Sequence, residues 1–330
     1  MKVVACYQVF NEEDYLDQSI MSIYPFVDKI YVYEPCYKTM LSILKEDRCT
    51  KNYKSGDNTA NIINKFAGKS NKVIYIPLGI INYDETQTYQ RILNEVDIGD
   101  YIWLIGADEI YDPDMCYKIR KLIDSKKYSA FWFYHLLFWH DFVHIRVGGK
   151  NHLMIYQKVT DTMFYSPRHM DIQWADSVGN LYGFQKNPQF NYECHYNGQK
   201  FISYLPEAKD IYYYHYAYVR NYQRLLEKIM WQYYMMVASE QNDEYRHSLN
   251  YESPLKFKLD TFQWFTNGDS HLVKRYNHKH PKIMRDHKYA NIRWDEQPIE
   301  LSYEEAISLV NDYKFSEFKV TSNGEIEYES

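Results

Sequence analysis

Oxygen-bearing side chains stand where several short apolar runs of the sequence end. They are Asn11, Glu12, Glu34, Asp108 and Glu109. Carboxylate oxygens suit a hard divalent cation such as Mg²⁺ or Mn²⁺, and such a cation usually also binds the phosphates of a substrate. If the ends of these runs meet in space, the residues predict a site for a metal ion and a diphosphate.

The apolar runs have the length and composition of buried strands. They cover residues 3–9, 29–33, 72–77 and 101–105, and helical patterns at 15–27, 60–66 and 87–96 separate them. Strands without a polar face are buried on both sides, which is typical of parallel sheets. We therefore expect an α/β fold, a Rossmann-like and mostly parallel sheet with helices on both faces. Ligands of such sheets bind beyond the carboxyl ends of the strands, where the acids lie.

The second half of the chain is more aromatic. A helix is expected from Asp112 to about residue 123, strands at 129–142, 152–159, 162–165 and 212–218, and a helix over about 221–237. The segment 131–142 is predicted to be core, although Trp139 and His140 could line an acceptor cleft. Residues 238–330 are polar and contain a late helical pattern at 303–313. No repeat or low-complexity linker separates them, so we expect a domain 1–237 and a mainly helical extension, 238–330, packed on it.

Composition narrows the class of protein. The net charge of −6 does not favour binding to nucleic acid. No run approaches the roughly 20 apolar residues of a membrane span, and the start does not resemble a signal peptide. Five cysteines without a CxxC pair indicate a reducing compartment. The expected location is the cytoplasm, with peripheral contact to a membrane left open. The 36 tyrosines suit polar, ring-shaped ligands, although compositional drift explains them equally well.

Three segments, in this order, resemble the family-two glycosyltransferases of GT-A type. VVACYQVFNEEDYLDQSIMSIYPFVDKIYVYE is similar to the family's first strand, N-E-E loop, helix and second strand, and SGDNTANIINKF to its S-x-D-x-T turn. GDYIWLIGADEIYD is similar to the fourth strand and its D-A-D-E metal motif. In most members the turn follows directly on the second strand, whereas residues 35–54 intervene here. The resemblance covers about residues 1–115 well, as a nucleotide-sugar half, and continues weakly through an acceptor half, 116–237.

The resemblance implies transfer of a sugar from a nucleotide diphosphate donor to a glycan, a lipid-linked acceptor or another hydroxyl, with Mn²⁺ or Mg²⁺. It implies Asp108 and His215 as metal ligands. The donor-binding residues that it implies are Val9, Asn11, Glu12, Glu34, Asp57, Arg91 and Ala107. The motif departs from the family at its first acid, which is Gly106 here. Glu109 or Glu34 could replace that acid.

A catalytic base is expected at the end of the segment HLMIYQKVTDTMFYSPRHMD, which resembles a family strand pair ending in a His-Glu step. The matching acid is Asp171, one residue later than in the family. Asp176 and Glu193 are the alternatives. A single base suits a single displacement, so the reaction is predicted to invert the anomeric carbon.

Several residues have a structural reading beside the functional one. His215 could be a core histidine, Arg91 a solvated helix residue, and Asp112 in Asp112-Pro113-Asp114 a helix cap. Gly68-Lys69-Ser70 follows a helix, where a phosphate-binding P-loop would need a strand. The irregularly spaced histidines predict a polar surface rather than a zinc site. They are His271, His278, His280 and His287.

Two rival functions remain. A sugar nucleotidyltransferase shares the sheet and the metal, but it needs a glycine-rich loop after the first strand, and residues 9–14 contain no glycine. A nucleotide-sugar or glycan binding protein that has lost catalysis is the other rival, and Gly106 favours it.

Overall fold

The computed structural model describes most of residues 1–225 and a few later segments. The described residues are 1–37, 48–81, 85–139, 141–146, 151–159, 162–164, 172–175, 181–184, 193–196, 199–204, 211–221, 224–225, 228, 273–292, 318–320 and 326–328. The helices that are described from end to end are α1 (Leu16–Ile23), α2 (Thr59–Ala67), α3 (Glu85–Ile92) and α4 (Pro113–Asp124), with 3₁₀ turns η1 (Tyr24–Phe26) and η5 (Lys282–Met284).

A parallel sheet forms the centre of the molecule. Its strands are β1 (Val3–Gln8), β2 (Lys29–Tyr37), β3 (Val73–Ile81) and β4 (Tyr101–Ile105), in the spatial order β3, β2, β1, β4. β1 pairs with β2 from Val4↔Lys29 and with β4 from Val3↔Tyr101, so these three strands end at the same edge. The loops after β1, β2 and β4 therefore lie near one another.

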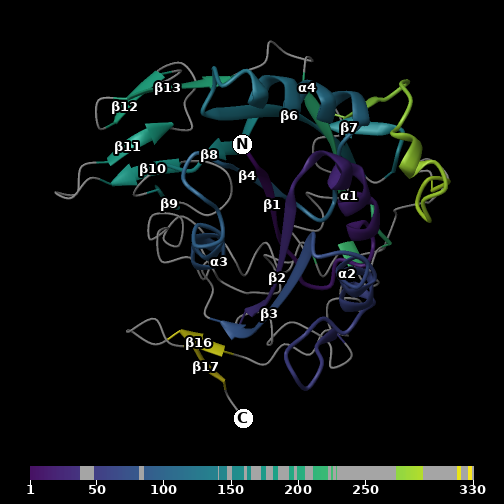
Figure 1. Cartoon of the computed structure of the whole chain (residues 1–330). Helices are drawn as coiled ribbons and strands as arrows, with labels where there is room; N and C mark the ends of the chain where they lie inside the picture. Colours follow the sequence, from purple (N-terminus) through teal and green to yellow (C-terminus); the bar gives the residue numbers. More distant parts are fainter. Residues whose placement is uncertain are drawn as a thin grey trace.

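Helices cover both faces of this sheet, as the alternation of side chains requires. In β1 and β4, Val3, Ala5, Trp103 and Ile105 pack in the core cluster that includes residues of α1, α2 and α4. The intervening residues of the same strands face a second cluster, which contains residues of α3. Figure 1 shows α1 and α2 on one side of β1–β3 and α3 on the other. The predicted α/β fold with helices on both faces is confirmed.

Beyond β4 the sheet becomes mixed. β8 (Asn151–Gln157) pairs antiparallel with β4 and with β6 (Ala130–Trp139), and β14 (Tyr212–Tyr218) lies parallel to β6. The shorter strands are β5 (Glu109–Ile110), β7 (His144–Arg146), β9 (Thr162–Phe164), β10 (Ile172–Ala175), β11 (Leu181–Phe184), β12 (Glu193–Tyr196) and β13 (Gln199–Tyr204). β9, β10 and β11 form a separate three-stranded sheet.

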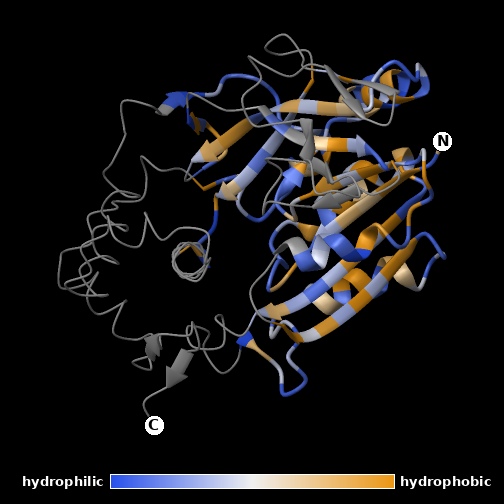
Figure 2. Ribbon diagram, turned by 90° about the vertical axis from the view of Figure 1, so that its left-hand side faces the viewer, coloured by the Kyte–Doolittle hydropathy of each residue, from blue (hydrophilic) through white to orange (hydrophobic). Residues whose placement is uncertain are grey.

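The segment 131–142 is largely core where it is described. Phe131, Phe133 and Phe138 are fully buried, because β6 lies inside the sheet. Figure 2 shows apolar residues concentrated on the strands of the central sheet. Of the described residues, none belongs to a helix that is long and apolar enough to cross a membrane.

Only the two ends of the intervening segment 35–54 are described. β2 continues four residues past the predicted end, to Tyr37, and the described chain resumes at Arg48. The backbone N–H of Ser55 donates to Oε1 of Glu34 at 2.8 Å, which fixes the turn 55–59 beside the second strand. The turn thus occupies the place beside β2 that the resemblance implies, although it comes later in the sequence.

Residues 273–289 pack against strands and loops of the first 220 residues. β15 (Val273–Arg275) pairs with β7, and residues 276–289 contribute Tyr276, Met284 and Tyr289 to a core cluster with Tyr15 and Tyr216. Two further strands, β16 (Phe318–Val320) and β17 (Ile326–Tyr328), pair with each other. The helix expected over 303–313 lies outside the described residues.

Candidate active site

The loop after β1 is shaped by Asn11. Its φ is +54°, a left-handed conformation that asparagine tolerates better than most residues. Its side chain donates to the carbonyl of Arg48 at 2.8 Å and accepts from the N–H of Gly56 at 3.0 Å. Asn11 therefore joins the first-strand loop to the returning segment, and its amide is occupied by protein contacts.

The turn 55–59 docks on the same loop. Asp57 accepts from the N–H of Thr59 at 3.0 Å and from that of Glu13 at 3.3 Å, and Thr59 accepts from the N–H of Glu12 at 2.7 Å. Burial raises the pKa of Asp57 to about 6, even though Arg224 lies 3.4 Å away. Glu34 is fully buried and accepts from Ser55 and the Tyr75 hydroxyl, so it supports the turn from below.

Asp108 lies between β4 and β5 among three basic side chains. Its Oδ2 accepts from Arg220 at 3.0 Å and from Lys228, and its Oδ1 lies 3.3 Å from Nε2 of His215. Burial alone would raise the pKa of this carboxyl, but Lys228, His215 and Arg220 hold it well below its ordinary value. Asp108 is therefore a carboxylate whose charge the protein itself balances.

Glu109, the next residue, points into the core. Its carboxyl lies beside the α-carbon of Gly106, where a Cβ would stand 3.1 Å from Oε1, and it accepts from the Tyr111 hydroxyl at 3.4 Å. Burial raises the pKa of Glu109 to about 7. The glycine in the acid motif thus leaves the room that the Glu109 carboxyl fills. Of the two candidates for the missing acid, Glu109 is the one adjacent to Gly106.

Arg220 connects the acids of two loops. Its guanidinium donates to Asp14 at 3.2 Å, Glu12 at 2.7 Å and Asp108 at 3.0 Å, and its Nε donates to the carbonyl of Ala217. Arg224 donates to Asp14 at 3.2 Å and to the carbonyl of Asn11. The segment after β14 therefore fastens the first-strand loop to Asp108.

Residues 287–289 also contact the loop after β1, at Asp14. Lys288 pairs with Asp14 at 2.5 Å, the Tyr289 hydroxyl donates to Asp14 at 3.0 Å, and Nε2 of His287 lies 2.7 Å from the Asp14 carbonyl. The imidazole of His287 stacks on Tyr15 with centroids 4.5 Å apart. The predicted polar surface is therefore wrong for His287, which is buried because it fills an aromatic layer and caps a backbone carbonyl.

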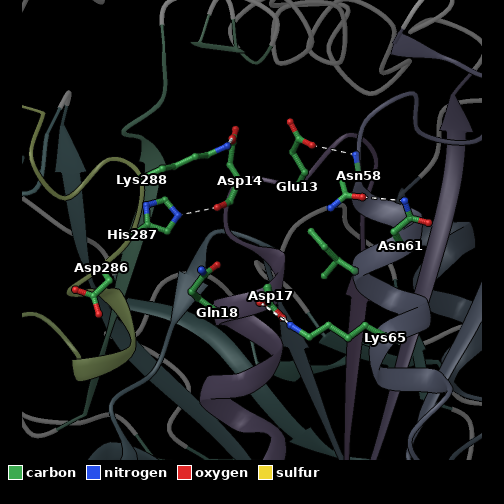
Figure 3. Close-up of a pocket in the computed structure, with 11 residues that line it drawn as sticks. Glu13, Asp14, Asp17, Gln18, Asn58, Asn61, Lys65, Asp286, His287 and Lys288 are labelled. Atoms are coloured by element: carbon green, nitrogen blue, oxygen red, sulfur yellow. Dashed lines mark hydrogen bonds and ion pairs between the residues drawn. The ribbon is translucent and has the colours of Figure 1, made fainter.

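A polar groove of about 500 Å³ runs between α1, α2 and residues 286–288. Figure 3 shows Lys288 and His287 directed at Asp14, and Lys65 of α2 paired with Asp17 of α1. Its lining residues are Glu13, Asp14, Asp17, Gln18, Asn58, Asn61, Ile62, Lys65, Asp286, His287 and Lys288. The groove shares Asp14 with the Arg220 network but does not include Asp108 or His215.

The structure places most of the sequence-predicted residues on these loops. Val9 donates its N–H to the carbonyl of Tyr33 at 2.9 Å, and Ala107 is buried beside Asp108. Arg91 is exposed on α3, and none of its described contacts joins it to Asp108. Asp112 accepts from the N–H of Asp114 at 3.0 Å, which confirms its reading as a helix cap.

The side chains of the predicted catalytic base and its alternatives are not among the described residues. Asp171 and its alternative Asp176 fall outside the described residues, and Glu193 is described only as a backbone position at the start of β12. Their assignment stays a prediction.

Sequence reasoning missed the basic side chains of the site. Arg220, Arg224 and Lys228 are spaced four residues apart, which aligns three cations on one side of a helix. Residues 224, 225 and 228 are helical, whereas Arg220 lies in a bend before them. The spacing was visible in the sequence, but its meaning depends on Glu12, Asp14 and Asp108, which are distant along the chain.

The described donor set does not fit a divalent cation at Asp108 and His215. Within the parts of the chain that the structure describes, no three histidine, cysteine or carboxylate side chains could share an ion. Both basic partners of Asp108 Oδ2 occupy lone pairs that a metal would need. A metal-binding histidine usually donates its other ring N–H to an acceptor, whereas Nδ1 of His215 is buried without a partner among the described residues.

Comparisons with known proteins give only distant structural likenesses. No family model matches the sequence, and neither does any curated protein sequence. Staphylococcus aureus TarS is 13% identical over 81% of this chain, with a TM-score of 0.39, and this chain spans 43% of the TarS chain. TarS 1-349 is 11% identical, with 100% and 96% of the two chains covered and a TM-score of 0.39.

A third solved structure is the mannosyltransferase PcManGT from Pyrobaculum calidifontis, in complex with GDP-Man and Mn²⁺. It is 11% identical, with 81% of this chain and 70% of that chain covered and a TM-score of 0.38. All the TM-scores are low, and likeness at this level does not establish a shared activity.

Proposed function

We propose that this chain is a GT-A-type glycosyltransferase that moves a sugar from a nucleotide diphosphate donor to an acceptor hydroxyl. The observation that carries the proposal is the meeting of three loops at the carboxyl edge of the parallel sheet. The loop after β1, the turn 55–59 and Asp108 after β4 are joined there by direct hydrogen bonds. Ligands of open α/β sheets bind at this edge.

The ordered sequence motifs give the proposal its substrate. The N-E-E loop and the S-x-D-x-T turn resemble donor-binding segments, and the structure holds both around Asn11 and Asp57. In this proposal Val9, Asn11, Glu12, Asp57 and Ala107 form the wall that faces the donor nucleotide. Glu34 supports that wall indirectly, through Ser55.

The remaining assignments extend the proposal. Inversion and Asp171 as general base are kept as predictions from the resemblance, as are Arg91 on the donor side and residues 1–237 as the catalytic domain. Dependence on Mn²⁺ or Mg²⁺ was also predicted, but the donor set around Asp108 does not support it. The acceptor is a glycan, a lipid-linked sugar or another hydroxyl compound, because the resemblance specifies only a hydroxyl nucleophile.

A donor screen tests the proposal. The purified chain would be incubated with a panel of nucleotide sugars, with Mn²⁺ and separately with chelator, while released nucleoside diphosphate is measured. Release from one donor, even by slow hydrolysis without acceptor, is the expected result. If no donor were hydrolysed and none altered the melting temperature, the proposal would fail.

Asp108→Asn is the sharpest variant for this function. We expect turnover to fall by about a hundredfold or more, because Asp108 positions the Arg220 and Lys228 side chains, and loss of one preorganised electrostatic group from such a site typically costs that much. The variant should remain folded, since Arg220 keeps Glu12 and Asp14 as partners. Steady-state rates and thermal melting measure the two effects. Asp97→Asn is the matched control, since Asp97 pairs with Lys2 at the opposite edge of the sheet.

A second candidate function is a nucleotide-sugar or glycan binding protein without catalysis. Gly106 in place of the motif's first acid favours it. Donor binding without any release of nucleoside diphosphate, in every metal condition and with a panel of acceptors, would select this alternative.

A further inference from the structure

The ion pairs around Asp108 have a particular charge balance. Among the residues that the structure describes, four carboxylates are joined to five cations within 4.0 Å. The carboxylates are Glu12, Asp14, Asp57 and Asp108, and the cations are Arg48, Arg220, Arg224, Lys228 and Lys288. A resident divalent cation needs carboxylates whose charge is uncompensated. Here the protein supplies the compensating charge.

Arg220 occupies the position of a bridging cation. One nitrogen of its guanidinium lies 2.7 Å from Glu12 and 3.0 Å from Asp108, so it joins the acid of the first-strand loop to the acid of the fourth-strand motif. Its side chain is only 2% exposed, and its other donors go to Asp14 and Ala217. The guanidinium is therefore fixed and does not need a ligand to hold it in place.

Lys228 differs from Arg220 because it has donors to spare. An ammonium group carries three N–H donors, and the one described partner of Lys228 is Asp108. Its side chain is 13% exposed, so it is less enclosed than that of Arg220, which is 2% exposed. A lysine placed in this way can bind a phosphate oxygen as a compact positive charge.

We propose that this chain transfers sugar without a resident divalent cation, with Lys228 as the group that binds the leaving diphosphate and Arg220 as the bridge between Glu12 and Asp108. This inference rests on the proposed function. In the reaction the bond from the acceptor oxygen to the anomeric carbon forms as the bond to the diphosphate breaks. The electron pair stays on the phosphate oxygen, next to the Lys228 ammonium. The acceptor proton goes to the general base, for which the sequence predicts Asp171.

Isothermal titration calorimetry with nucleoside diphosphates tests this inference without relying on turnover. UDP, GDP, ADP, CDP and dTDP would each be titrated into the full chain, once in EDTA and once in Mn²⁺. We expect at least one of them to bind in EDTA, with an affinity within about twofold of that in Mn²⁺. Mn²⁺ titrated alone should not bind at Asp108. Any heat measured with the wild-type chain should therefore also be measured with Asp108→Asn.

Variants at position 228 locate the effect. Lys228→Gln should weaken nucleoside diphosphate binding by about tenfold or more, because a charge-assisted hydrogen bond is lost. Lys228→Arg, which keeps the charge, should retain most of the affinity. Lys2→Gln is the matched control. It removes a lysine that pairs with Asp97 at 2.9 Å at the far edge of the sheet, and it should leave binding unchanged.

The outcomes separate this inference from the proposed function. Binding that occurs in Mn²⁺ and disappears in EDTA would overturn the metal-free site and leave the glycosyltransferase proposal intact. Metal-independent binding that Lys228→Gln does not weaken would overturn the role of Lys228. Absence of binding by every nucleotide in both conditions would remove the proposed function, and this inference with it.

Discussion

The two edges of the parallel sheet both carry acids paired with bases, but in opposite surroundings. At the amino edge, Lys2 pairs with Asp97 at 2.9 Å, and the two side chains are 60% and 78% exposed. At the carboxyl edge, Arg220 pairs with Asp14 at 3.2 Å, and the side chains are 2% and 1% exposed. The same kind of ion pair is therefore exposed to water at the amino edge of the sheet and buried in the protein at the carboxyl edge.

This difference predicts which charged side chains can be replaced without loss of stability. The two charges of an exposed pair stay hydrated whether or not they are paired, and water screens their attraction. Such a pair therefore contributes little to stability. A buried pair has given up its hydration, so removing one partner leaves the other charge without compensation. We expect the carboxyl edge to respond strongly to single substitutions and the amino edge to respond hardly at all.

Arg220→Met should give the largest effect. It leaves three acids, Glu12, Asp14 and Asp108, without their shared partner, and breaking a buried pair in this way typically costs about 3–5 kcal/mol. Urea denaturation at pH 7 measures the free energy of unfolding. A loss below about 1 kcal/mol would mean that the network stabilises little, and that the two edges are alike.

Glu109→Gln should change how stability depends on pH. The pKa of Glu109 is raised to about 7 from an ordinary 4.5, so between these values the folded state holds a proton that the unfolded state releases. The free energy of unfolding therefore falls as pH rises through this window, by about 3 kcal/mol in total. The glutamine variant cannot ionise and should lose this fall.

Urea titrations of wild type and variant at pH 5, 6, 7 and 8 measure that difference. The contribution of Asp57, whose pKa is raised to about 6, is common to both proteins and cancels in the comparison. Parallel pH profiles would show that Glu109 is already ionised in the folded protein, and would place it with the carboxylates of the cation network.

Lys2→Gln should give the smallest effect, with no measurable change in the melting temperature. Both members of the pair are in water and the contact is screened by salt. Thermal melting at low and at moderate salt checks this. A clear loss of stability at low salt would show that the amino edge is electrostatically coupled to the rest of the sheet.

The central strands could be predicted from sequence because each has a strong local pattern. Tyr101–Ile105 and Tyr212–Tyr218 have the boundaries that their apolar composition predicts. The short strands β5 and β7 were not predicted, because two or three residues carry no usable periodicity. β2 was predicted too short, since Pro35 reads as the end of a strand although the register shift between Glu34 and Pro35 accommodates it.

Residues of the candidate site were predicted where they follow a strand end or lie in a recognisable turn. Asn11, Glu12 and Asp108 were found in this way, and so was Asp57 from its turn chemistry. Arg220 and Lys228 were missed because a helix with regularly spaced cations is usually a solvated surface. The opposing charges that make this one a buried network lie about 110 to 210 residues earlier in the chain, at separations of 112, 120, 206 and 208 residues.

The hydrogen bond from Ser55 to Glu34 fixes the turn 55–59 beside β2, whatever the number of residues between Tyr37 and Arg48. The chain leaves β2 at Tyr37 and resumes at Arg48, and the turn is fixed by the hydrogen bond rather than by its distance along the chain. Since the entropy of closing a loop grows only with the logarithm of its length, a change in the number of residues between Tyr37 and Arg48 should cost little as long as Arg48 keeps its contacts with Asn11 and Asp57. We therefore expect insertions between Tyr37 and Arg48 to leave the residues around Asp57 in place.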